Sequence, residues 1–160
     1  RRRSRSLMNK PALQPSLKGR ALRLLSQREH SRLELERKLA EHETEPGQLA
    51  KALDELQARG FISEERVIES VIHRRAGKLG TARVRQELAA KGLSGEAVAA
   101  AVEQLRGTEL ARAREVWSRK FGAPATDPKE KARQIRFLVS RGFAAEVVRR
   151  VVQGGSDELA

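Results

Sequence analysis

The chain has 160 residues and a formal net charge of +12, with 34% charged and only 3% aromatic side chains. So few aromatic residues exclude a large aromatic core, and the absence of cysteine excludes a disulfide framework and thiolate metal sites. No apolar run is long enough to span a membrane, and the basic N-terminus lacks the apolar part of a signal peptide. We therefore expect a cytoplasmic protein with no membrane contact.

The N-terminal residues 1–16 are rich in Arg and Ser, contain Pro11 and Pro15, and show no periodicity. We expect this basic segment to be disordered and to attract polyanions weakly. From residue 17 onward the chain is dominated by Ala, Leu, Val, Arg and Glu, with no period-two alternation, so the pattern predicts helices and no strands. Residues 154–160 are expected to form a flexible tail.

Three helices are predicted in residues 17–60, which we expect to form a first module. Ser31 and Glu34 have the spacing of a capping box, in which each side chain accepts a hydrogen bond from a backbone N–H at the start of the second helix. Pro46 stands at the expected first turn of the third helix, and Gly60 ends it.

A second module of three helices is predicted over residues 61–106. Ser63 opens its first helix, and Thr81 has the place of an N-cap for the second. That helix ends before Gly92, because glycine adopts the left-handed conformation after a helix with little strain. Ser94 is the expected N-cap of the third helix.

The third module is expected to occupy residues 107–153. Gly107 and Thr108 are expected to introduce its first helix and so to separate it from the preceding module. Pro128 has the position of a first helical residue in the next helix, and Gly142 marks the turn into the last one.

The apolar positions of these modules recur at an offset of about 50 residues. Leu88 corresponds to Leu138, and the turn Lys91-Gly92-Leu93 matches Arg141-Gly142-Phe143, whereas the first copy has Glu41-His42-Glu43 there. Such self-similarity is typical of stacked units that are each too small to bury an apolar face alone. The sequence therefore predicts an all-α tandem repeat of three three-helix modules, forming an elongated, curved, solenoid-like protein.

Residues suited to catalysis or metal binding are scarce. His30, His42 and His73 are isolated, with none of the spacings of metal ligands. The stretch from Gly77 to Thr81 lacks both the spacing of a phosphate loop and a preceding strand, so it reads as a helix end followed by a cap. We expect no catalytic residue, no metal site and no cofactor.

Short motifs follow one another in order through the three modules. They are Ser31-x-x-Glu34-Leu35-x-x-Lys38-Leu39, Gly60-Phe61-Ile62-Ser63-Glu64-Glu65-Arg66, Gly80-x-x-x-Val84-x-x-Glu87-Leu88-x-x-Lys91-Gly92, Arg119-Lys120-Phe121 and Leu138-x-x-Arg141-Gly142-Phe143. With these motifs the chain resembles the RecX family of recombination regulators from about Leu17 to Val152. Val67-Ile68 depart from the Phe-Ala that members usually carry, which affects local packing.

The resemblance implies a monomeric protein that binds the RecA recombinase and its filament on single-stranded DNA. It also implies inhibition of RecA's ATP hydrolysis, of filament extension and of strand exchange, in recombination, DNA repair and the SOS response. Weak, salt-sensitive binding to single- or double-stranded DNA is expected from the basic charge.

Positive charge is concentrated in the second and third modules, where it could meet acidic protein surface or DNA phosphates. The candidate RecA- or DNA-binding residues, chosen by charge, are Arg74, Arg75, Lys78, Arg83, Arg85, Arg119, Lys120, Arg133 and Arg136.

Two alternatives remain open at this stage. The chain could be a direct, non-specific DNA-binding protein, because its helix hairpins have the size of helix–turn–helix modules. The third helix of the second module offers almost no side chain that could hydrogen-bond a base, which disfavours sequence-specific recognition. A helical adaptor for a different acidic partner is the other alternative.

Overall fold

The structure is a computed structural model that describes residues 14–154. These residues form helices and no strands, as the sequence predicts. The predicted disordered segment and flexible tail lie almost entirely outside the described residues. The helices are α2 (Leu17–Gln27), α3 (Arg32–Leu39), the short 3-10 helix η1 (Ala40–His42), α4 (Gln48–Ala58), α5 (Glu64–Arg75), α6 (Thr81–Ala90), α7 (Glu96–Lys120), α8 (Pro128–Ser140) and α9 (Ala145–Val152).

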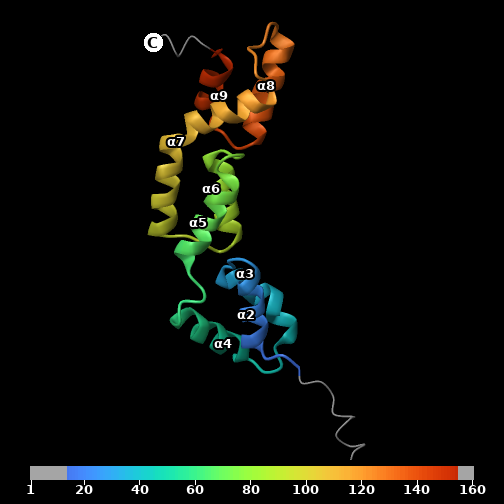
Figure 1. Ribbon diagram of the computed structural model, residues 1–160, viewed down its shortest axis with the longest axis vertical. Coiled ribbons are helices and arrows are strands. Elements are labelled where there is room, and N and C mark those ends of the chain that lie inside the picture. Colours follow the sequence, from blue (N-terminus) through green and yellow to red (C-terminus); the bar gives the residue numbers. More distant parts are fainter. Residues whose placement is uncertain (1–13, 155–160) are drawn as a thin grey trace, which may run out of the picture.

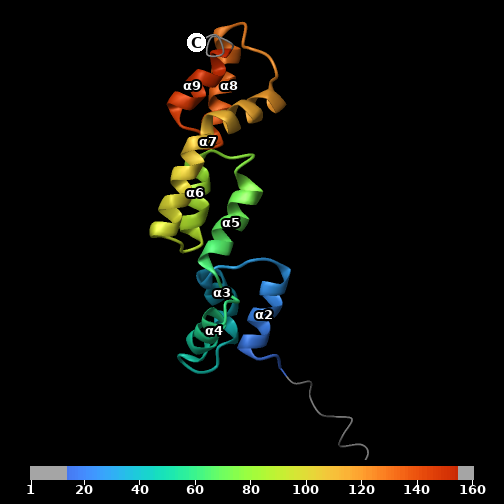
Figure 2. The ribbon, with the colours of Figure 1, turned by 60° about the vertical axis from the view of Figure 1, so that its left-hand side comes forward.

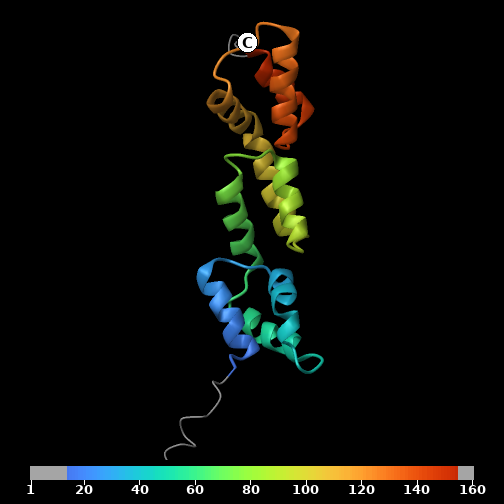
Figure 3. The same ribbon diagram turned by 90° about the vertical axis from the view of Figure 1, so that its right-hand side faces the viewer.

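Three groups of helices follow one another along the long axis of the molecule, as Figure 1, Figure 2 and Figure 3 show from three sides. Each group has its own apolar core. Module one consists of α2, α3 and α4; module two of α5, α6 and the first half of α7; module three of the rest of α7 with α8 and α9. Their buried residues are Leu17, Ala21, Leu35, Leu39, Leu49, Leu53, Leu56 and Ile62 in module one; Val67, Ile68, Val71, Leu79, Val84, Leu88, Leu93, Ala101 and Leu105 in module two; and Ala113, Val116, Leu138, Phe143, Val148, Val151 and Val152 in module three.

Helix α7 differs from the prediction, because the helices expected on either side of Gly107 are one continuous helix of 25 residues. Its Leu105 packs into the core of module two and its Ala113 into that of module three, so apolar burial on both sides offsets the helix-weakening effect of the glycine. Figure 1 shows α7 changing direction as it passes between the modules. The expected boundaries after residues 60 and 106 stay predictions, and α7 runs through the second.

The predicted caps are confirmed in part. The Ser31–Glu34 capping box is present, and the Ser63 hydroxyl accepts the N–H of Arg66. Thr81 and Ser94 are not caps: α6 and α7 begin after glycines that provide no side-chain hydrogen bond. Pro46 also lies further from its helix than expected, since Gly47 is the N-cap of α4.

A turn glycine docks on the preceding module at each of the two junctions. Gly92, in the turn between α6 and α7, lies against the Leu33 side chain of module one. Gly142, in the turn between α8 and α9, lies against Arg83 of module two in the same way. The two pairs are related by the repeat offset, so the repeat in the sequence reflects a repeated contact between modules.

The first copy of the repeat carries His42 where the other two carry these glycines. At this place α3 continues into the 3-10 helix η1, and His42 does not have a positive φ angle. The conformation of the first copy therefore does not require a glycine at this position.

None of the described helices is long and apolar enough to cross a membrane. Within residues 14–154 there is also no group of three or more His, Asp or Glu side chains that could hold a metal ion.

A comparison of two alanine substitutions tests the docking role of Gly142. Gly142 and Gly60 follow helices with the same pattern of backbone hydrogen bonds and have φ angles of 91° and 82°, so Gly→Ala costs about 1–2 kcal/mol from backbone strain at either position. A Cβ at position 142 would in addition lie 2.8 Å from the backbone nitrogen of Arg83, whereas position 60 faces open space. Gly142→Ala should therefore lower the free energy of unfolding by roughly 1–3 kcal/mol more than Gly60→Ala.

Denaturant unfolding of the two variants, followed by circular dichroism, measures this difference. Equal losses of stability in both variants would mean that the turn of module three is not packed closely against module two.

Candidate interaction surface

The junction between modules two and three is built around the carboxylate of Glu109, in the middle of α7. Its side chain is only 5% exposed. One oxygen accepts the N–H of Thr81, the first residue of α6, at 2.6 Å, and the other accepts the N–H of Ala144, the N-cap of α9, at 3.2 Å. Neither helix has a side-chain cap of its own, so one negative charge serves two positive helix ends.

Arg112 lies one turn further along α7, and its guanidinium group binds backbone carbonyls and threonine hydroxyls next to the start of α6 and on α7 itself. Its five N–H groups donate to five oxygens, which belong to Ala76, Leu79, Thr81, Leu105 and Thr108. Burial lowers the pKa of Arg112, and the nearby Glu109 carboxylate opposes that shift. Because five donors in a fixed plane are needed, lysine cannot replace this side chain.

The backbone completes the contact between modules two and three. The N–H of Gly80 donates to the carbonyl of Arg141 at 2.8 Å, and a Cβ at position 80 would overlap the backbone of Gly142. Arg83 donates to the carbonyl of Ser140 at 2.7 Å. The start of α6 and the turn before α9 therefore fit each other closely.

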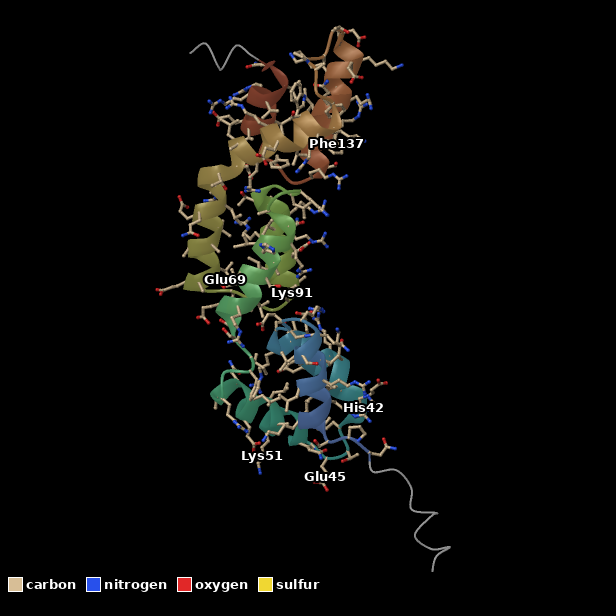
Figure 4. All side chains as sticks on the ribbon, in the orientation of Figure 1. His42, Glu45, Lys51, Glu69, Lys91 and Phe137 are labelled. Atoms are coloured by element: carbon tan, nitrogen blue, oxygen red, sulfur yellow. The ribbon has the colours of Figure 1, made fainter. Side chains whose placement is uncertain are left out.

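The junction between modules one and two depends on the Glu34 carboxylate of the capping box. Figure 4 shows Lys91 at the end of module two that faces module one, and its ammonium lies 3.1 Å from Glu34. Burial raises the pKa of Glu34. The hydrogen bond from the Ser31 N–H and the ion pairs with Arg28 and Lys91 lower the pKa by more than this, so that the net value is about 2. Glu34 thus caps a helix and joins two modules.

Beside this junction, His30 is 1% exposed. Its Nδ1 lies 3.0 Å from the carbonyl of Arg28, so Nδ1 carries the proton that it donates, and Nε2 accepts from the Lys38 ammonium at 3.2 Å. Burial lowers the pKa of His30. A second proton on the ring would face the Lys38 ammonium, so the folded protein favours the neutral imidazole.

The structure brings two of the candidate residues together in what we call the junction groove. This groove lies between α6, α7, the end of α8 and the start of α9, and it has a volume of about 570 Å³. Arg83 and Arg85 line it, together with Arg106, which the charge argument missed. Its other lining residues are Thr81, Ala82, Gln86, Val102, Glu109, Val139, Gly142, Phe143, Ala144 and Val147.

Three more candidates meet in a smaller hollow of about 270 Å³, which we call the Phe137 pocket. Figure 4 shows Phe137 beside the contact of α7 and α8. The Lys120 ammonium lies 5.2 Å from the centre of its ring, and the guanidinium of Arg141, a residue that the charge argument also missed, lies 4.8 Å away. Both are cation–π distances. The lining residues are Lys78, Val116, Arg119, Lys120, Phe137 and Arg141.

The other candidates line neither of these two hollows. Arg75 forms an ion pair with Glu87 at 3.1 Å and so has a structural role. Arg133 pairs with Glu130 and lies over the ring of Phe121. Arg74 and Arg136 are exposed and make no side-chain hydrogen bond or ion pair within residues 14–154.

Glu109 and Arg112 are not among the predicted site residues, because they are single charges on a partly apolar helix and not part of a basic cluster. Leu105, Glu109 and Ala113 have a spacing of four residues, which places the carboxylate on the buried face of α7. A lone acid at such a position was the available signal. The junction groove and the Phe137 pocket both combine basic and apolar side chains from modules two and three, which suits them to binding acidic partners.

Comparisons with known proteins match most of the described region to one family. Residues 18–56 match the model described as "RecX, first three-helix domain", residues 63–102 match the second three-helix domain, and residues 108–152 match the third. A "Regulatory protein RecX" of Leptothrix cholodnii is 56% identical over 145 residues, covering 91% of either chain. That of Ralstonia nicotianae is 49% identical and covers 87% of either chain.

Solved structures share the fold at much lower identity. A "Crystal structure of regulatory protein RecX" aligns with a TM-score of 0.71 at 20% identity, covering 86% of this chain and 71% of that one. The crystal structure of RecX from Lactobacillus salivarius aligns with a TM-score of 0.70 at 15% identity, covering 86% and 92%. The succession of three-helix units is therefore a fold that these proteins have in common.

The pH dependence of stability tests the environment of His30. Folded His30 has a pKa below 6.5, so its contribution to stability is complete above about pH 6.5 and is lost as the pH falls below that value. The Glu34 contribution, with a folded pKa of about 2, is lost only below about pH 4.5. Between pH 7 and pH 5, His30→Gln should therefore flatten the fall in the melting temperature.

Thermal unfolding in this pH range measures the effect, with His73→Gln as the control because His73 is exposed. If the melting temperatures of His30→Gln and of the wild type fall in parallel between pH 7 and pH 5, His30 does not favour the neutral form in the folded protein.

Proposed function

The chain belongs to the RecX family of regulatory proteins, and we propose from this that it binds RecA filaments on single-stranded DNA and inhibits them. Inhibition would act on ATP hydrolysis, filament extension and strand exchange, in recombination, repair and the SOS response. The protein would act as a cytoplasmic monomer, without catalytic residues or a cofactor. The relatives compared above are named as regulatory proteins, which agrees with a role in controlling another enzyme.

The repeated docking of modules is the observation that supports this proposal most directly. Gly92 on Leu33 and Gly142 on Arg83 stack the modules in one line, so that each adds contact area along the same axis. A filament repeats its own surface along one axis as well. Weak contacts of several linked modules on such a target raise the overall affinity through effective concentration.

The nine basic candidates remain proposed contacts with RecA or with DNA. Lys78 in the Phe137 pocket and Arg136 on α8 are the most informative to change, because neither side chain bonds another described residue. Arg75 and Arg83 already bind Glu87 and the carbonyl of Ser140, so their loss would disturb the fold as well. Reversing Lys78 and Arg136 changes the surface charge and leaves the cores intact.

Titration of RecA filaments on single-stranded DNA with this protein tests the proposal, with ATP hydrolysis as the readout. We expect inhibition well below one molecule per RecA protomer. The variant Lys78→Glu/Arg136→Glu should need about tenfold more protein for the same inhibition. Arg23→Glu/Arg37→Glu, which reverses two exposed cations of module one, is the matched control and should inhibit like the wild type.

Two controls separate this proposal from direct DNA binding. Wild-type protein is added to single-stranded DNA alone and to RecA without DNA. Unchanged ATP hydrolysis at saturating protein, together with tight salt-sensitive binding to bare DNA, would contradict filament regulation and favour a non-specific DNA-binding protein.

A further inference from the structure

The junction groove combines an apolar floor with a basic rim. Val102 and Phe143 are buried at its base, and Val147 is half-buried. Val139 stands at 51% exposure and is one of the large hydrophobic residues that the described region leaves in contact with water. The rim carries exposed guanidinium groups, so a ligand meets apolar surface and positive charge together.

The guanidinium groups of this rim are available to a ligand to different degrees. Arg85 makes no side-chain hydrogen bond or ion pair within residues 14–154. Arg106 has one loose contact, 3.7 Å from Glu103, and its side chain is 60% exposed. Arg83 uses one of its nitrogens for the carbonyl of Ser140 and retains further donors. Two to three cationic groups can therefore pair with carboxylates.

We propose that the junction groove binds an acidic segment of a partner protein, with an aliphatic side chain placed on Val139 and Val147 and flanking carboxylates paired with Arg85 and Arg106. Arginine pairs with carboxylates through two parallel hydrogen bonds, which fixes the orientation of the segment. The aliphatic side chain covers the exposed face of Val139. This inference rests on the proposed function, and it assigns the segment to RecA.

The lining of the groove favours a protein over a nucleic acid. Single-stranded nucleic acids bind through bases stacked on exposed aromatic faces, together with phosphates on a basic groove. Phe143, the aromatic residue of this lining, is only 4% exposed, and the accessible apolar surface is aliphatic. A second copy of the chain is disfavoured as occupant, since the net charge of +12 makes two copies repel.

The groove also depends on the junction that encloses it. Glu109 and the turn at Gly142 contribute to its wall, and the lining comes from modules two and three alike. Binding of the segment therefore requires the fixed arrangement of these modules. A rigid, preformed groove lowers the entropic cost of binding a flexible segment.

A binding measurement with a matched control tests this inference. Fluorescently labelled full-length protein is titrated with RecA filaments on single-stranded DNA, and its anisotropy is followed. The variant Arg85→Ala/Val139→Ser removes the unpaired cation and the exposed apolar group, and circular dichroism verifies its helicity. We expect about tenfold weaker binding. Arg23→Ala/Phe61→Ser removes an exposed cation and an exposed apolar group from module one and should change affinity by less than about twofold.

A second measurement identifies the occupant. A benzoylphenylalanine photo-crosslinker replaces Ala82, an exposed residue of the groove lining, and mass spectrometry identifies the RecA peptide that it captures. The captured peptide should contain acidic residues next to an aliphatic one.

Wild-type affinity in the groove variant, or crosslinking to DNA in place of RecA, would overturn the inference while the proposed function stands. Failure of the wild-type protein to bind filaments at all would overturn the proposed function itself.

Discussion

The architecture of the basic half of this molecule depends on one buried carboxylate. Glu109 accepts N–H groups from the starts of α6 and α9, and Arg112 binds the carbonyl groups of Ala76 and Leu79, just before the start of α6. Leaving a buried charge without partners costs several kcal/mol, so a helix that carries Glu109 at a buried position must find donors for it. Two helix ends without caps of their own supply them. The relative orientation of modules two and three follows from this requirement.

Contacts between neighbouring modules also explain how three small apolar cores form one ordered molecule. Each module has a small apolar core, and the turn of one module packs on the second helix of the module before it. Gly92 and Gly142 permit that approach, and Glu34 and Glu109 add a charged contact at each junction. Hydrophobic contact holds each unit together, while polar contacts determine how successive units are placed. An extended, regularly stacked surface is the result.

Much of this could be predicted from the sequence, because local signals dominate within a module. The Ser31 capping box, Pro128 at the start of α8 and the left-handed Gly92 depend on neighbours within a few residues. The predictions that were wrong concern residues whose partners lie far away in the sequence. Thr81 was expected to cap α6, yet Glu109 binds that helix start from a point 28 residues away. Gly107 was expected to introduce a new helix and so separate two modules, but burial on both sides of α7 outweighs the effect of one glycine. The groove could not be predicted from local sequence signals either, because α6, α7, the end of α8 and the start of α9 form it together.

Glu109 is argued to set the arrangement of modules two and three, and the distance between these two modules tests that role most directly. Because the chain has no cysteine, spin labels can be attached at Glu69→Cys on α5 and Lys129→Cys on α8, two exposed positions. Double electron–electron resonance should give one narrow distance distribution for this pair of spin labels. The additional change Glu109→Gln should broaden the distribution, because an amide has one acceptor oxygen in place of the two carboxylate oxygens that bind the two helix ends. A distribution that stays equally narrow in the Glu109→Gln protein would contradict the account.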